Sequence, residues 1–151
     1  MFSLICCLWA EDNRIWLQRQ NVPASVAQVF SAKKLYAQYE FAFTLNPFYL
    51  RGDFNGDGEP ETALLVKNKK SGKVGIAICH GGKDEVFFVG AGTTIEGGGD
   101  GFSWMDNLAG LCAGAGAGKL VGEALSVEKS ESGGGLTYWE GKTYKWQQHG
   151  D

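Results

Sequence analysis

RGDFNGDGEPETALLVKN, residues 51–68, joins an acidic, glycine-rich loop to an apolar segment. The loop is rich in the Asp, Asn and Gly residues that favour turns. The residues on either side are mostly those that favour strands. The stretch therefore predicts two strands, over 48–54 and 62–67, with a tight loop between them. Whether this loop is only an acidic turn or also holds a metal ion decides what function can be inferred.

Oxygen-bearing groups recur at every second position of the loop. They are the side chains of Asp53, Asn55, Asp57 and Glu61, together with the backbone carbonyl of Glu59. A calcium ion takes about six to eight oxygen ligands, and Gly58 permits the sharp turn that would direct these groups to one point. Without a cation, three neighbouring carboxylates would repel one another. The spacing predicts a structural Ca²⁺ site, and the alternative is an acidic turn that stays unoccupied.

The spacing differs from that of an EF-hand. Leu64 stands at the twelfth position, where an EF-hand needs a bidentate Glu, and predicted strands rather than helices flank the loop. The stretch GDFNGDGEPETALLV, residues 52–66, resembles instead the calcium-loop signature DFNGDGxPDxxV of FG-GAP and VCBS-type repeats, which occur in the β-propeller of integrin alpha subunits.

The resemblance covers about 15 residues and implies a set of ligands. The implied side-chain ligands are Asp53, Asn55, Asp57 and Glu61, and the implied backbone ligand is Glu59. Glu61 stands where those repeats usually carry Asp. The loop occurs once, and a chain of 151 residues is too short for a propeller of several blades, so the propeller fold is not implied.

The chain as a whole is similar to a family of small bacterial proteins that combine such a loop with two further stretches. These stretches match Leu125–Ser132 and Tyr138–Asp151. No activity is known for that family, so the similarity implies nothing about function beyond the loop.

Composition and charge exclude some classes of protein. The sequence is 44% hydrophobic and 21% charged, as is ordinary for a globular chain, and its length fits a single domain over 1–151. A net charge of -3 with dispersed lysines argues against a nucleic-acid partner. The glycines concentrate between Gly90 and Gly122, so the 90–122 segment is predicted to be a glycine-rich loop within the domain.

The N-terminal segment, residues 1–20, allows two interpretations. Met1–Ala10 is apolar but too short to cross a bilayer, and it lacks the basic region that opens a signal peptide. It is either the remnant of an export signal or a native strand, and we expect a periplasmic or secreted protein rather than a cytoplasmic one. Cys79 and Cys112 would then form a disulfide in an oxidising compartment or stay reduced.

The periodicity predicts an α+β domain. One helix is predicted over 22–40, because apolar residues recur there at helical spacing and Pro23 suits a first turn. From Phe41 onward the period is two, and polar turns separate short strand candidates. The 85–89 strand is apolar on both faces, which is typical of a central strand. We expect one N-terminal helix packed on a mainly antiparallel meander sheet of about six to seven strands.

Known catalytic motifs are not matched. The 113–120 segment lacks the spacing of a P-loop. Neighbours on a strand such as Cys79 and His80 point to opposite faces, so we do not expect them to form a dyad. The alternative function is a small hydrolase that uses acidic residues of the 96–106 loop. They are Glu96, Asp100 and Asp106, which surround Trp104.

Four aromatic residues are candidates for a ligand surface that would bind a protein or a glycan. They are Trp104, Trp139, Tyr144 and Trp146. Cross-strand and core packing is the other interpretation of these residues. We therefore expect a non-catalytic β-rich domain with one structural calcium loop, no assigned catalytic residue and no membrane span.

Overall fold

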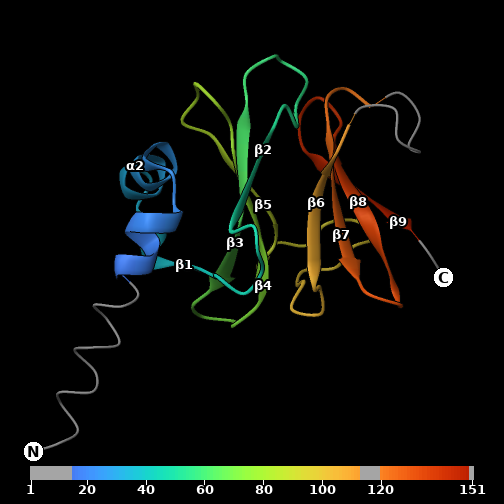
Figure 1. Ribbon diagram of the computed structural model, residues 1–151, viewed down its shortest axis with the longest axis horizontal. Coiled ribbons are helices and arrows are strands. Elements are labelled where there is room, and N and C mark those ends of the chain that lie inside the picture. Colours follow the sequence, from blue (N-terminus) through green and yellow to red (C-terminus); the bar gives the residue numbers. More distant parts are fainter. Residues whose placement is uncertain (1–14, 113–119, 150–151) are drawn as a thin grey trace, which may run out of the picture.

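The computed structural model describes residues 15–112 and 120–149, and in these residues nine strands form two antiparallel sheets (Figure 1). Sheet 1 contains β1 (Tyr39–Phe41), β2 (Tyr49–Gly52), β3 (Glu61–Asn68), β4 (Val74–Cys79) and β5 (Val86–Gly90). Its order is β1-β3-β4-β5, and β2 pairs with the other half of β3. Sheet 2 contains β6 (Asn107–Leu111), β7 (Ala124–Lys129), β8 (Gly133–Trp139) and β9 (Tyr144–His149), paired in sequence order.

The expected fold class is therefore wrong. The protein is mainly β, with nine strands in two sheets in its described part, rather than a helix on one sheet of six to seven strands. The difference arises mainly at β6, which lies inside the segment predicted to be a loop. Its sequence, NLAGL, holds Asn and Gly, which are uncommon in strands, so pairing with β7 rather than local preference determines it.

The helical part is shorter than expected. The predicted 22–40 helix is α2 (Ala24–Ala32) followed by a 3₁₀ turn, η1 (Leu35–Ala37), and Lys34 adopts a left-handed conformation between them. Residues 15–21 are also helical. None of the described helices has the length and apolar content needed to cross a bilayer. Met1–Ala10 lies outside the described residues, as does most of the 113–120 segment.

Sheet 1 is the middle of three layers, because both of its faces are covered. Along β3, Leu64 and Val66 belong to the cluster formed with α2, and Ala63 and Leu65 belong to the core shared with sheet 2. The alternation of strand side chains produces this division. It also explains β5, which is apolar on both faces although it lies at an edge of sheet 1.

The described part of the 90–122 segment is ordered by aromatic and apolar anchors. Ile95, Phe102 and Met105 are buried in the core between the sheets, and the ring of Phe102 stacks on that of Trp146 at 5.2 Å. A long loop without structure is uncommon in a compact domain. Here the buried side chains fix the segment to the core between the sheets.

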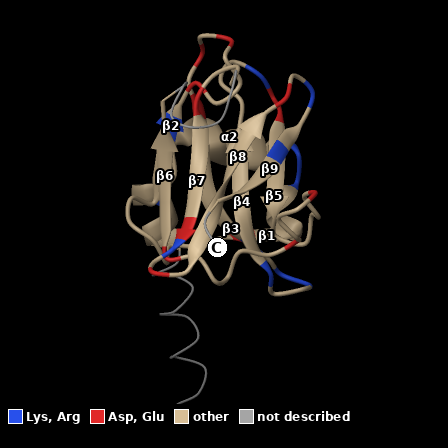
Figure 2. Cartoon of the chain, turned by 90° about the vertical axis from the view of Figure 1, so that its right-hand side faces the viewer, with Lys and Arg blue, Asp and Glu red and all other residues tan. Residues whose placement is uncertain are grey.

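Charged residues of both signs occur mainly in the loops and at the ends of the strands (Figure 2). One of these loops, between β2 and β3, contains the acidic motif. It lies at one end of the two sheets and is the centre of the candidate site.

Candidate metal centre

The β2–β3 loop folds around its own alternate side chains. Asp53 accepts hydrogen bonds from the amides of Gly56 (2.7 Å) and Gly58 (3.0 Å). Asn55 Oδ1 accepts from the amide of Asp57 at 2.8 Å, and Gly56 and Gly58 both have positive φ. Asx turns of this kind are a local property of Asp and Asn, so the sequence itself curls the loop.

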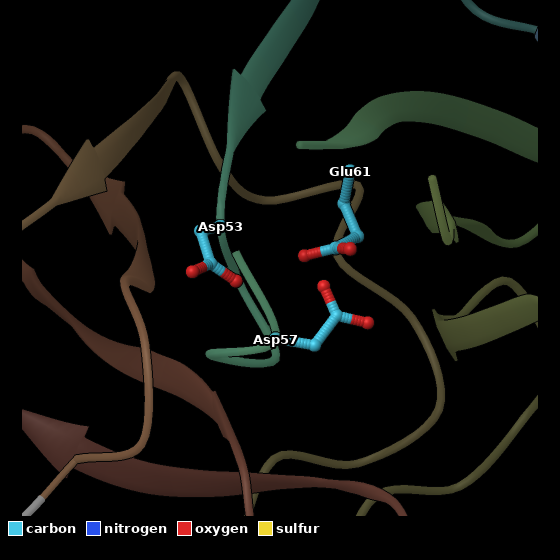
Figure 3. A group of neighbouring side chains, drawn as sticks. All are labelled: Asp53, Asp57 and Glu61. Carbon is cyan, nitrogen blue, oxygen red and sulfur yellow. The ribbon is translucent and has the colours of Figure 1, made fainter. Parts of the chain in front are cut away.

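Three carboxylates converge inside this curl. Asp53, Asp57 and Glu61 each place an oxygen so that the three atoms lie within 4.8 Å of one another. Figure 3 shows the three carboxylates directed toward one another from the loop and from the start of β3. Oxygen ligands in this number and spacing could form part of the shell of a hard divalent cation.

Glu61 is the most constrained of the three. Its side chain is fully buried (0% exposed), because it lies on the face of β3 that packs toward sheet 2. Oε2 accepts a hydrogen bond from the amide of Asn55 at 3.1 Å, whereas Oε1 has no partner among the described residues. Burial raises the pKa of Glu61 and the charge of Asp57 adds to the rise, whereas the nearby backbone amides of Asn55, Phe54 and Gly81 oppose it. Of these amides, that of Asn55 bonds Oε2, and none makes a hydrogen bond of normal geometry to Oε1. A buried oxygen without a partner is costly unless an ion or a proton satisfies it.

Asp57 lies on the open side of the cluster. Lys83, in the turn between β4 and β5, places Nζ 2.8 Å from Asp57 Oδ2. The hydrogen bond from Lys83 is the main reason that the pKa of Asp57 is lowered to about 2. The amide of Glu59 donates to Asp57 Oδ1 at 2.9 Å and favours the same charged state.

A buried relay connects the loop to sheet 2. Asn55 Nδ2 lies 3.2 Å from His80 Nδ1, and His80 Nε2 lies 3.0 Å from the hydroxyl of Tyr144 on β9. Since Asn55 Oδ1 accepts from a backbone amide, its Nδ2 is the donor, so His80 carries its proton on Nε2. Burial lowers the pKa of His80, which favours this neutral form.

The loop also meets sheet 2 through backbone contacts. The carbonyl of Asp53 accepts a hydrogen bond from the amide of Glu123 at 2.7 Å, directly before β7. Gly122 has φ +88, and a Cβ there would lie 2.5 Å from both the Asp53 carbonyl oxygen and the Gly56 nitrogen. The candidate site is therefore built at the junction of the two sheets.

The five predicted ligands all lie in this loop or at its end. Asn55 is buried and Glu59 is exposed. Asn55 differs from expectation in one respect, because its amide nitrogen contacts Asp57 and His80, while only Oδ1 could face an ion.

The four aromatics proposed as a ligand surface lie in two groups. Trp139 and Tyr144 pack around His80 and Phe87, with ring centroids 5.1 and 5.9 Å from the ring of His80. Trp104 is 37% exposed and makes an edge contact with the buried ring of Trp146. These two line a shallow groove of about 330 Å³.

The acidic residues of the 96–106 loop have separate partners. Glu96 pairs with Lys145, Asp100 pairs with Lys73, and Asp106 accepts hydrogen bonds from Ser130. Cys79 and Cys112 are both free thiols in the structure. Cys79 belongs to the core beneath α2, and His80 faces sheet 2, as the strand alternation predicts.

His80 and Lys83 are two residues of the site to which the sequence pattern assigned no role, although both bond to the loop. A signal for His80 is present, since it continues the alternation of Ile76 and Ile78, which face the core between the sheets. The lysine has no comparable signal, because its partner lies 26 residues away.

Fold and site together define a mainly β protein with a cation-competent acidic loop at the junction of two antiparallel sheets. Comparison with protein-family models, curated proteins and solved structures found no match for this chain.

Proposed function

We propose that the protein is a non-catalytic β-rich module in which the 53–61 loop binds one structural Ca²⁺ that holds the two sheets together. The observation that carries the proposal is Glu61, whose fully buried carboxylate belongs to the three-carboxylate cluster and has one oxygen without a hydrogen-bond partner among the described residues. A divalent cation at this point would satisfy that oxygen and neutralise the cluster.

Calcium is favoured over other cations by the type of ligand. All the candidate ligands are oxygens, as a hard cation requires, and no Cys or His belongs to the carboxylate cluster in the described residues. The resemblance of the loop to FG-GAP and VCBS-type calcium loops supports the same ion. The resemblance implies calcium binding, which is a proposal for this chain.

A structural role follows from where the loop lies. The loop is bonded to Glu123 before β7 and, through His80, to Tyr144 on β9, so an ion that fixes the loop also fixes the contact between the sheets. Binding to the folded state alone would raise the free energy of unfolding by RT ln(1 + [Ca²⁺]/Kd).

The test is the melting temperature measured with chelator and with about 5 mM CaCl₂, several times the expected Kd of about 10⁻⁴–10⁻³ M. We expect the wild type to gain about 2–9 °C with calcium and Asp57→Ala to gain nothing. Asp100→Ala is the matched control, because it removes one carboxylate paired with a lysine elsewhere and should keep the gain. The same titration with MgCl₂ should give a smaller shift, since Mg²⁺ needs a stricter octahedral shell.

The rival to this proposal is a structural protein whose acidic turn stays empty. In that case the wild type would melt at the same temperature with chelator and with calcium. Such a result would exclude a calcium site at this affinity and leave Lys83 as the counter-ion of the loop.

A further inference from the structure

Lys83 supplies a positive charge at the edge of the carboxylate cluster. Its ammonium group lies 2.8 Å from Asp57 Oδ2, on the open side of the carboxylate cluster. Among the described residues, no other lysine or arginine forms an ion pair with Asp53, Asp57 or Glu61. The cation-free loop is therefore neutralised in part by a charge that the chain itself supplies.

A divalent ion and this ammonium group would compete for the same carboxylate. An ion bound to Asp57 at about 2.3–2.6 Å would neutralise the negative charge that now attracts the ammonium group of Lys83. It would also repel the ammonium group, since two positive charges would then share one carboxylate. Lys83 can leave easily, because its side chain is 49% exposed and water can solvate it.

The other bonds of the loop do not compete in this way. The oxygens of Asp53 accept from the amides of Gly56 and Gly58, and Asn55 is held by the buried His80. These bonds set the curl of the loop and need not break when an ion enters. Asp57 Oδ2 also accepts a hydrogen bond from Asn55 Nδ2 at 3.2 Å, but Asn55 is buried and Lys83 is exposed, so Lys83 is the more readily replaced of the two partners.

We propose that Lys83 is a tethered counter-ion that occupies the outer side of the carboxylate cluster in the cation-free protein and is displaced when the cation binds. This inference rests on the proposed function of the loop. Lys83 stabilises the loop without the ion and lowers the affinity of the loop for the ion. Affinity is thus set by a residue from a different hairpin, and it can be raised without touching a ligand.

The first test is the calcium affinity of the wild type, Lys83→Gln and Lys73→Gln, measured by isothermal titration calorimetry. An exposed ion pair and the repulsion of a nearby ammonium group are modest effects, so we expect Lys83→Gln to bind calcium about three- to ten-fold more tightly. Lys73→Gln is the matched control, because Lys73 forms a similarly exposed ion pair with Asp100. Its affinity should stay within about two-fold of wild type.

The second test follows the amine itself. Wild-type protein is acetylated with a limiting amount of N-hydroxysuccinimidyl acetate, with calcium or with chelator, and the labelled lysines are quantified by mass spectrometry. We expect calcium to increase the labelling of Lys83 about two-fold or more relative to Lys73, because displacement breaks its hydrogen bond to Asp57.

The outcomes separate this inference from the proposal beneath it. If the wild type binds no calcium, both the structural site and the role of Lys83 are overturned. If the wild type binds calcium but Lys83→Gln binds no more tightly than Lys73→Gln, only the role of Lys83 is overturned. Tighter binding by Lys83→Gln with unchanged labelling of Lys83 would overturn its displacement.

Discussion

The imidazole of His80, directly after β4, lies 3.0 Å from the hydroxyl of Tyr144 on β9, and its other ring nitrogen lies 3.2 Å from Asn55 in the acidic loop. The two rings are also in edge contact, with Phe87 and Trp139 around them. One buried polar chain therefore joins the loop to the interface between the sheets. Such a chain stabilises the fold only while every member has a partner.

Replacing Tyr144 with Phe tests this chain. The change keeps the ring and removes only the hydroxyl, so the Nε2 proton of His80 loses its buried acceptor. We expect the free energy of unfolding to fall by about 1–3 kcal/mol, measured by urea denaturation with chelator present. Tyr39→Phe is the control, because Tyr39 is similarly buried and its hydroxyl forms no recorded hydrogen bond with another described residue. Equal losses in the two variants would contradict a role for the hydroxyl of Tyr144.

Replacing Glu61 with Gln should affect the protein in opposite ways with and without the ion. In chelator, the variant removes a buried charge and lets an amide donate toward Asp53 or Asp57. It should be at least as stable as wild type. With about 5 mM CaCl₂, well above the expected Kd, it should lose the gain in melting temperature that wild type shows. Glu140→Gln, an exposed carboxylate beside Lys145, should behave as wild type in both conditions. A variant that is strongly destabilised in chelator would show that the charge of Glu61 is needed for folding itself.

The loop was predictable from the sequence because its parts are contiguous. The spacing of Asp53, Asp57 and Glu61 alone places three carboxylates close together, and the glycines between them permit the turns. The structure confirms that these three are close enough to bind a metal ion. It does not identify the ion, so calcium remains a prediction.

The surroundings of the loop were not predictable in the same way. His80, Lys83 and Tyr144 reach it through the register of β4 and β9, which depends on long-range pairing. The same limit explains β6, whose local sequence does not favour a strand but whose pairing with β7 makes it one. The apolar residues on both faces of the 85–89 strand indicated burial on both sides, yet they did not show that a second sheet would cover one of those sides.

The rate at which the Cys79 thiol is modified reports how often the fold opens at the face of sheet 1 that packs against α2. Burial raises the pKa of its thiol to about 12, so the thiolate is scarce in the folded state at pH 8. We expect iodoacetamide to modify the exposed Cys112 readily and Cys79 only through opening of the fold, with peptide mapping used to separate the sites. Calcium should slow the modification of Cys79 and leave that of Cys112 unchanged.

The raised pKa of Cys79 also predicts the sign of a pH effect. The folded state keeps its proton to higher pH than the unfolded chain, whose thiol has an ordinary pKa of about 9.0. The contribution of this thiol to the free energy of unfolding is fully present below a pH of about 9.0 and is lost as the pH rises above that value. Cys79→Ala should therefore show a smaller decline in stability between pH 8.5 and about 10.5 than wild type, and an equal decline in both would contradict the shift.

Gly122 tests whether the loop must press against sheet 2. A Cβ at this position would lie 2.5 Å from the Asp53 carbonyl oxygen and the Gly56 nitrogen, so Gly122→Ala must move the loop that holds the carboxylates. We expect the variant to lose about 2–4 kcal/mol of stability and to bind calcium at least about ten-fold more weakly, a loss of about 1.4 kcal/mol in binding. Gly141→Ala is the control, because Gly141 has a similar positive φ with open space around it. Its loss should be limited to backbone strain of about 1 kcal/mol, with unchanged calcium affinity. Normal calcium binding by Gly122→Ala would show that the site forms without its contact to sheet 2.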